Sequence, residues 1–110
     1  MQRGDLRWFR FSRPDKRRPV LLLTRDSALE FPGEVTVAPV TTRVRGIPLE
    51  VFLSKVDGMP RECAVNLDHV QMVSRGKIGA LVTRLDNSRM AEVQDALTFA
   101  LGFRVEPRPS

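Results

Sequence analysis

The chain has 110 residues, of which 42% are hydrophobic and 28% are charged. These values are typical of one globular domain with a single core. No apolar run approaches the ~18 residues that cross a bilayer, which argues against a transmembrane protein. The single cysteine, Cys63, cannot form an internal disulfide, so we expect a reducing, cytoplasmic location.

The net charge of +5 is concentrated near the N-terminus. Residues 1–25 contain eight Lys and Arg against two Asp, whereas the rest of the chain is nearly neutral. A local positive field attracts polyanions such as RNA, DNA or anionic lipid, and also acidic protein segments. A basic surface that only keeps the protein soluble is the alternative that composition leaves open.

Five to seven short strands are expected along the chain, because apolar runs of strand length alternate with Pro, Gly and polar loops. A helical turn capped by Asp26 and Ser27 separates the second and third runs. Residues 70–73 continue or bend the fifth run, and a turn at residues 74–77 precedes the sixth. The runs cover residues 6–11, 19–24, 35–42, 49–53, 63–70 and 78–84.

Regular alternation within residues 63–70 would place the apolar side chains, Cys63 among them, on one face. Asn66 and Asp68 would then point the same way from the opposite face. Cys63 is therefore interpreted as a core residue rather than as a reactive thiol. His69, whose ordinary pKa suits proton transfer near neutral pH, would lie on the face opposite Asp68.

The apolar period changes near the C-terminus and predicts an amphipathic helix of about fifteen residues. Asp86 is its expected N-cap and Gly102 its expected stop, and residues 104–110 are an expected flexible tail. Its apolar positions are Met90, Val93, Leu97, Ala100 and Leu101. Short strands followed by one helix predict a mainly β fold, a small, strongly curved antiparallel sheet or open barrel closed by the helix.

No metal or cofactor is expected. The sequence has one Cys and one His, and its carboxylates lack the spacing of a calcium loop. The glycines stand apart rather than in a phosphate-binding loop, so nucleotide hydrolysis has no support.

Arg18 stands directly before an apolar run, where a strand could hold its guanidinium toward a phosphate. Thr41 and Thr42 end the next apolar run and could donate hydroxyls to the same phosphate. Asp68 could orient Arg18 or move a proton. The alternatives are a solvated surface arginine, threonines chosen for β-propensity, and an edge aspartate bonded to backbone.

Aromatic and basic residues interleave near the N-terminus, as stacking on single-stranded nucleic acid requires. The aromatic side chains could instead face the core, and Trp8 could lie at a subunit interface. The residues concerned are Trp8, Phe9 and Phe11 with Arg7, Arg10 and Arg13.

Five short motifs occur in a fixed order: RGDLRW at residues 3–8, RPVLLL at 18–23, VAPVTT at 37–42, VNLD at 65–68 and RL at 84–85. This ordered set resembles the MazF/PemK family of toxin endoribonucleases, the toxin halves of type II toxin–antitoxin systems. The resemblance spans residues 1–103, which we expect to form a single domain.

The resemblance implies an SH3-like antiparallel barrel of the type found in MazF, PemK and CcdB toxins, closed by the C-terminal helix. It implies a homodimer that cleaves single-stranded RNA without a metal, giving 2′,3′-cyclic phosphate and 5′-hydroxyl ends. The substrate would be mRNA, with tRNA or rRNA as further targets, and translation and growth would stop. An acidic antitoxin protein would neutralise the toxin, and no membrane would be involved.

Arg18 matches the family's arginine before proline, Thr41 matches the threonine that ends the second apolar motif, and Asp68 matches an acidic residue that some members use. These three are the expected catalytic residues. Some relatives have an arginine where Asn66 stands, so no general base is assigned. The expected RNA-binding residues are Lys16, Arg17, Thr42, Arg43, Arg45 and Asn66.

Two other functions stay open. The same fold hosts toxins that poison DNA gyrase through a C-terminal helix face, and a plain RNA-binding barrel would hold RNA without cutting it. The basic residues lie at the other end of the sequence from the helix, which favours RNA over gyrase.

Overall fold

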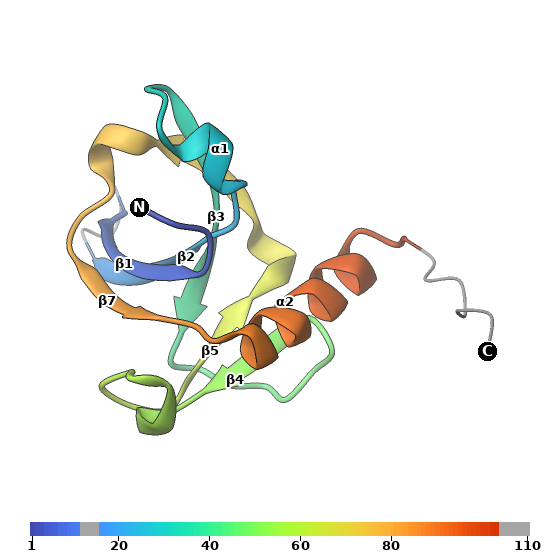
Figure 1. Ribbon diagram of the computed structural model, residues 1–110. Coiled ribbons are helices and arrows are strands. Elements are labelled where there is room, and N and C mark those ends of the chain that lie inside the picture. The colour runs from blue at the N-terminus through green and yellow to red at the C-terminus, as the bar shows by residue number, and fades with distance from the viewer. Residues whose placement is uncertain (12–15, 104–110) are drawn as a thin grey trace.

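The first three apolar runs pair as strands at the centre of one sheet (Figure 1). The computed structural model describes residues 1–11 and 16–103. Its strands are β1 (Asp5–Arg10), β2 (Arg17–Leu22), β3 (Glu34–Thr41), β4 (Glu50–Leu53), β5 (Cys63–Asn66), β6 (Gln71–Ser74) and β7 (Leu81–Arg84). Its helices are α1 (Asp26–Leu29), α2 (Asn87–Ala100) and the 3₁₀ turns η1 (Lys55–Asp57), η2 (Leu67–His69) and η3 (Arg75–Lys77).

The sheet is antiparallel and curled, with the strand order β4-β5-β3-β2-β1-β7, and β6 also pairs with β3. The helix α2 packs along β4 and η2 on one side of the curl (Figure 1). This arrangement confirms the predicted mainly β fold with a C-terminal helix. Neither α-helix within residues 1–11 and 16–103 is long and apolar enough to cross a membrane.

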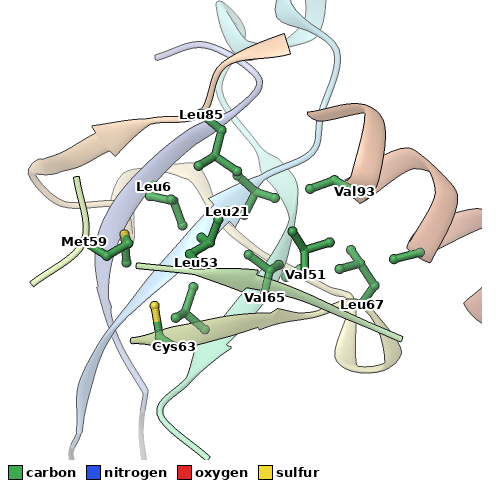
Figure 2. Close-up of a cluster of buried hydrophobic side chains, with 13 residues drawn as sticks. Leu6, Leu21, Val51, Leu53, Met59, Cys63, Val65, Leu67, Leu85 and Val93 are labelled. Atoms are coloured by element: carbon green, nitrogen blue, oxygen red, sulfur yellow. The ribbon is translucent and has the colours of Figure 1, made fainter. Parts of the chain in front are cut away.

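Both faces of β2 are covered, so its side chains alternate between two apolar clusters. Leu21 packs with Leu6 in the larger cluster, which β4, β5 and α2 complete (Figure 2). Val20 and Leu22 point the other way and pack with β3 and with Leu29 of α1. Because β2 is held from both sides, the residues at its start extend from a rigid base.

The C-terminal helix lies between the residues that the sequence predicts as its N-cap and stop. The carboxylate of Asp86 accepts the backbone N–H of Arg89 at 2.8 Å, as an N-cap does. Gly102 has a φ of +76°, the left-handed conformation that ends a helix. The helix ends at Ala100, one residue before the last apolar position of the predicted helix, and Leu101 is 61% exposed.

The expected regular strand over residues 63–70 is also wrong. β5 ends at Asn66, whose side-chain oxygen accepts the backbone N–H of Asp68 at 3.0 Å and caps η2. A short polar side chain that bonds the backbone two residues on competes with strand geometry. Asn66 and Asp68 therefore do not extend from one strand face. Residues 12–15, within a polar loop that the sequence predicts over residues 12–18, and the expected tail at residues 104–110 lie outside the described residues.

A buried carboxylate joins the first strand to the last. Asp5 is fully buried and accepts bonds from Arg84 Nε at 2.6 Å, Arg7 Nε at 3.0 Å and the backbone N–H of Gln2 at 3.1 Å. Burial raises the pKa of Asp5, but the bonds from Arg84, Gln2 and Arg7 outweigh it, and the pKa lies below its ordinary value. The RGDLRW and RL motifs thus meet in one ion-pair network.

Asp5→Asn should lower the free energy of unfolding by roughly 3 kcal/mol at pH 7, because it removes the charge that both arginines face. The folded-state pKa of Asp5 is depressed, so its contribution is complete above its ordinary pKa of 3.8 and disappears as pH falls through the folded-state value. Urea unfolding should therefore show a wild-type advantage at pH 7 that shrinks below about pH 4. Asp95→Asn, at an exposed helix position, is the control; equal losses in both variants would contradict this role.

Candidate functional site

The register between β2 and β3 brings two distant motifs together. The ladder pairs Leu22 with Val37 and ends where Val20 faces Pro39. Continued by two residues, the same register sets Arg18 opposite Thr41. The ladder stops before that point, and the prolines of both strands at its end have no N–H to donate. The end of β3 pairs with β5 on its other side. The start of β2 and the end of β3 are left flanking an open space.

A cleft of about 690 Å³ occupies this space. Trp8 of β1, the start of β2, the end of β3 and the β4–β5 connection line it. Five cations contribute, and no carboxylate does among the described lining residues. The cations are Lys16, Arg17, Arg18, Arg43 and Arg61. Such a concentration of like charge suits a bound polyanion.

Most of the expected site residues lie in this cleft. Six of the nine line it: Lys16, Arg17, Arg18, Thr41, Thr42 and Arg43. The sequence motifs that suggested a shared phosphate site are therefore neighbours in space.

The other three expected site residues do not line the cleft. Arg45 Nε lies 3.4 Å from a carboxylate oxygen of Glu50, and Asn66 caps η2. Asp68 is exposed on η2, which follows the C-terminal end of β5. The cleft lies at the other end of β5, where Cys63 lines it. Within residues 1–11 and 16–103, no hydrogen bond or ion pair joins Asp68 to Arg18.

Thr41 and Arg18 are available to a ligand in different ways. The hydroxyl oxygen of Thr41 accepts the backbone N–H of Arg43 at 3.1 Å, which fixes the side chain and leaves its own proton free to donate. Arg18 is exposed, and its guanidinium makes no hydrogen bond or ion pair with the described residues. The cleft therefore contains a hydroxyl donor and a planar cation, two kinds of group that bind oxyanions.

One wall of the cleft contains none of the site residues that the sequence predicts. Met59, Pro60 and Arg61 form this wall. No local pattern could have assigned Arg61, because the wall comes from the β4–β5 connection and meets the basic segment only in the folded chain. Gly58 has a φ of +91°, a left-handed conformation in the turn that leads to this wall.

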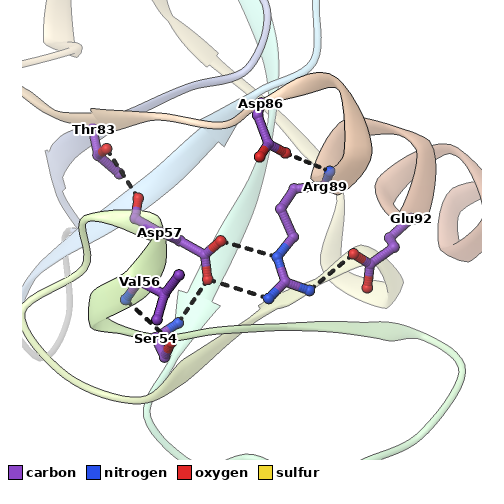
Figure 3. Close-up of polar contacts among 7 residues, drawn as sticks. All are labelled: Ser54, Val56, Asp57, Thr83, Asp86, Arg89 and Glu92. Carbon is purple, nitrogen blue, oxygen red and sulfur yellow. Dashed lines mark hydrogen bonds and ion pairs between the residues drawn. The ribbon is translucent and has the colours of Figure 1, made fainter.

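An ion pair ties this wall to the C-terminal helix (Figure 3). Arg89 Nε of α2 donates to the Asp57 carboxylate at 2.9 Å, and the Ser54 N–H donates to the same carboxylate at 3.0 Å. The Thr83 hydroxyl donates to the Asp57 backbone carbonyl at 3.0 Å. Burial raises the pKa of Asp57, but the bonds from Arg89 and Ser54 outweigh it and lower the pKa overall. The carboxylate therefore stays charged and holds the loop.

The aromatic residues divide between core and cleft. Phe9 is buried in the smaller apolar cluster, where it packs edge-to-face with Phe11. The centroids of the two rings are 4.9 Å apart. Trp8 instead lines the cleft, and the Cζ atom of Arg17 lies 4.4 Å from the centroid of its ring. Cation and indole at this distance attract one another.

Comparison with known proteins agrees with this fold and shows the family. The model of the PemK-like, MazF-like toxins of type II toxin–antitoxin systems matches residues 2–101. The chain is 36% identical over 103 residues to the probable endoribonuclease MazF2 of Mycobacterium tuberculosis, covering 93% of this chain and 99% of that protein. It is 39% identical over 100 residues to the probable endoribonuclease MazF5 of the same species, covering 90% and 91%.

Solved structures show the same fold. The Mycobacterium tuberculosis toxin MazF-mt6 superposes with a TM-score of 0.84 at 31% identity, covering 92% of this chain and 99% of that one. A MazE–MazF structure from Deinococcus radiodurans gives a TM-score of 0.80 at 28% identity, covering 94% and 98%. The chain belongs to the PemK-like, MazF-like toxin family of type II toxin–antitoxin systems.

Cys63 should be unreactive although it lines the cleft. The residue is 2% exposed, and burial, with the Asp57 charge as the smaller cause, raises the pKa of its thiol to about 11. Only the thiolate is a nucleophile, so iodoacetamide should label the folded protein slowly at pH 8 and rapidly in denaturant. Mass spectrometry measures the labelled fraction; equal labelling rates in the two conditions would contradict the buried, protonated thiol.

Proposed function

We propose that this chain is an endoribonuclease toxin that cleaves single-stranded RNA without a metal ion. The 2′-hydroxyl would attack the adjacent phosphate and leave 2′,3′-cyclic phosphate and 5′-hydroxyl ends. The observation that carries the proposal is that Arg18 and Thr41 line one cleft with four further cations and no described carboxylate. The endoribonuclease names of relatives at 36–39% identity support the same reaction class.

Arg18 acts on the charge that develops during cleavage. A guanidinium stays protonated in proteins and is a poor proton acceptor, so Arg18 stabilises the negative phosphorane oxygens. Thr41 donates its hydroxyl proton to a non-bridging oxygen and fixes the phosphate. The bond from the 2′-oxygen to phosphorus forms and the bond from phosphorus to the 5′-oxygen breaks. The 2′-hydroxyl proton passes to water, and the leaving 5′-oxygen takes a proton from water. No residue is assigned to removing the 2′-hydroxyl proton, and Asp68, outside the cleft, receives no role.

The remaining cleft cations bind the flanking phosphates. Lys16, Arg17 and Arg43 lie beside the two proposed catalytic residues, and Arg61 faces them from the β4–β5 wall. Contacts of this kind position a strand without reading its bases. Arg45 and Asn66, which do not line the cleft, could contact only a strand that extends past it.

Arg18→Ala should lower the rate of cleavage of a labelled single-stranded RNA in EDTA by at least ~10²-fold, because a charge-stabilising donor is lost. The control is Arg25→Ala, which removes an exposed arginine that does not line this cleft. Thermal unfolding of both variants should match the wild type. End-group analysis of the wild-type products should give cyclic phosphate. Undiminished cleavage by Arg18→Ala would remove this residue from the mechanism, and RNA binding without any scission would indicate a plain RNA-binding protein.

The cellular setting follows from the family. The MazE–MazF structures from Deinococcus radiodurans join a toxin of this fold to a second protein. We extend this to an antitoxin for the present chain, an acidic and partly disordered segment that covers the cationic cleft in the cytoplasm and so restores translation and growth.

A homodimer is proposed as well. Phe99, Leu101 and Phe103 are 60–70% exposed around the end of α2, an apolar surface that a second copy could cover. Light scattering at micromolar concentration should give twice the chain mass of 12.4 kDa. A mass of one chain at that concentration would contradict the dimer.

A further inference from the structure

We infer that Trp8 and Arg17 form a platform on which one nucleobase of the bound strand stacks beside the phosphate site. The inference rests on the proposed function, because the bound strand is the RNA proposed as the substrate of this cleft. It adds a second requirement that this RNA must meet. The RNA must present an unstacked base next to the phosphate that Arg18 holds, which a duplex does not.

The platform is built by the pairing of β1 with β2. Trp8 faces Pro19 across the two strands, and Arg17 lies two residues from Pro19 on the same face of β2. A residue in this diagonal position is within reach of a large ring. Arg17 reaches it, since its Cζ atom lies 4.4 Å from the indole centroid.

The stack leaves one surface for a ligand. Trp8 is half-buried, so the protein supports the indole, whereas Arg17 is exposed. The guanidinium carbon lies over the indole ring, and both residues line the cleft, so a base in the cleft would meet the outer side of Arg17. Nucleobases stack on arginine planes and on aromatic rings, and cation–π attraction holds the arginine flat.

A role in phosphate binding alone explains this geometry less well. Four other cations line the cleft, and Arg18, the neighbour of Arg17 on β2, has no ring beneath it among the described contacts. A phosphate contact needs charge, which lysine supplies equally, whereas a stack needs a plane, which only arginine has. Replacing arginine by lysine therefore separates the two roles.

The test uses two 2′-O-methyl oligonucleotides of about nine nucleotides, within the usual site size for single strands. One is an oligoadenylate and the other is its abasic counterpart with the same phosphates, and neither can be cleaved. Wild-type protein should bind the oligoadenylate roughly tenfold or more tightly than the abasic strand. Trp8 is the one tryptophan and the chain has no tyrosine, so the fluorescence of the protein reports on this ring. The fluorescence should change when the oligoadenylate binds and not when the abasic strand binds.

Arg17→Lys should lose this base preference and keep its affinity for the abasic strand. Arg25→Lys, the same exchange at an exposed position that does not line this cleft, should behave as wild type. Equal wild-type affinity for both strands, no binding to either, or an equal loss for both strands in Arg17→Lys would overturn the platform. Cleavage of a 2′-hydroxyl RNA in EDTA is measured separately, so a nuclease without base preference and a base-binding protein without nuclease activity give different results.

Discussion

The antiparallel pairing of β2 with β3 is the constraint on which the rest of the structure depends. It brings the start of β2 near the end of β3, and its register, continued by two residues, sets Arg18 opposite Thr41 although the two are far apart in the sequence. The ladder ends at the prolines, so the strands continue past it without bonding to each other. A sheet that simply continued would have filled this place with backbone hydrogen bonds; an interrupted one leaves a cleft with rigid sides.

The cleft is electrostatically unfavourable for the protein alone, because five cations line it without a described carboxylate. Other interactions of the fold offset this repulsion between the cations. Two apolar clusters fix β2 from both faces, Asp5 ties β1 to β7, and Asp57 ties the β4–β5 wall to α2. The two carboxylate anchors, Asp5 and Asp57, do not line the cleft, so among the described residues neither of them neutralises its cations.

Local patterns in the sequence were sufficient for most elements. Alternation predicted the strands, and Asp86 and Gly102 marked the ends of α2, because caps and periodicity act within a few residues. The same patterns placed Arg18 and Thr41 at strand ends. They failed at Asn66, where one side-chain bond to the backbone turned an expected strand into η2. They could not find Arg61 or the Asp5–Arg84 pair, since these contacts join segments that only the folded sheet makes neighbours.

The central claim is that Arg18 and Thr41 act on the same phosphate, and a double-mutant cycle tests it most directly. The cleavage efficiency of one RNA in EDTA would be measured for wild type, Arg18→Ala, Thr41→Val and the double variant. If both side chains hold one phosphate, the double variant should be much less impaired than the product of the two single losses. Losses that multiply would show that the two residues act independently, and would contradict the shared site.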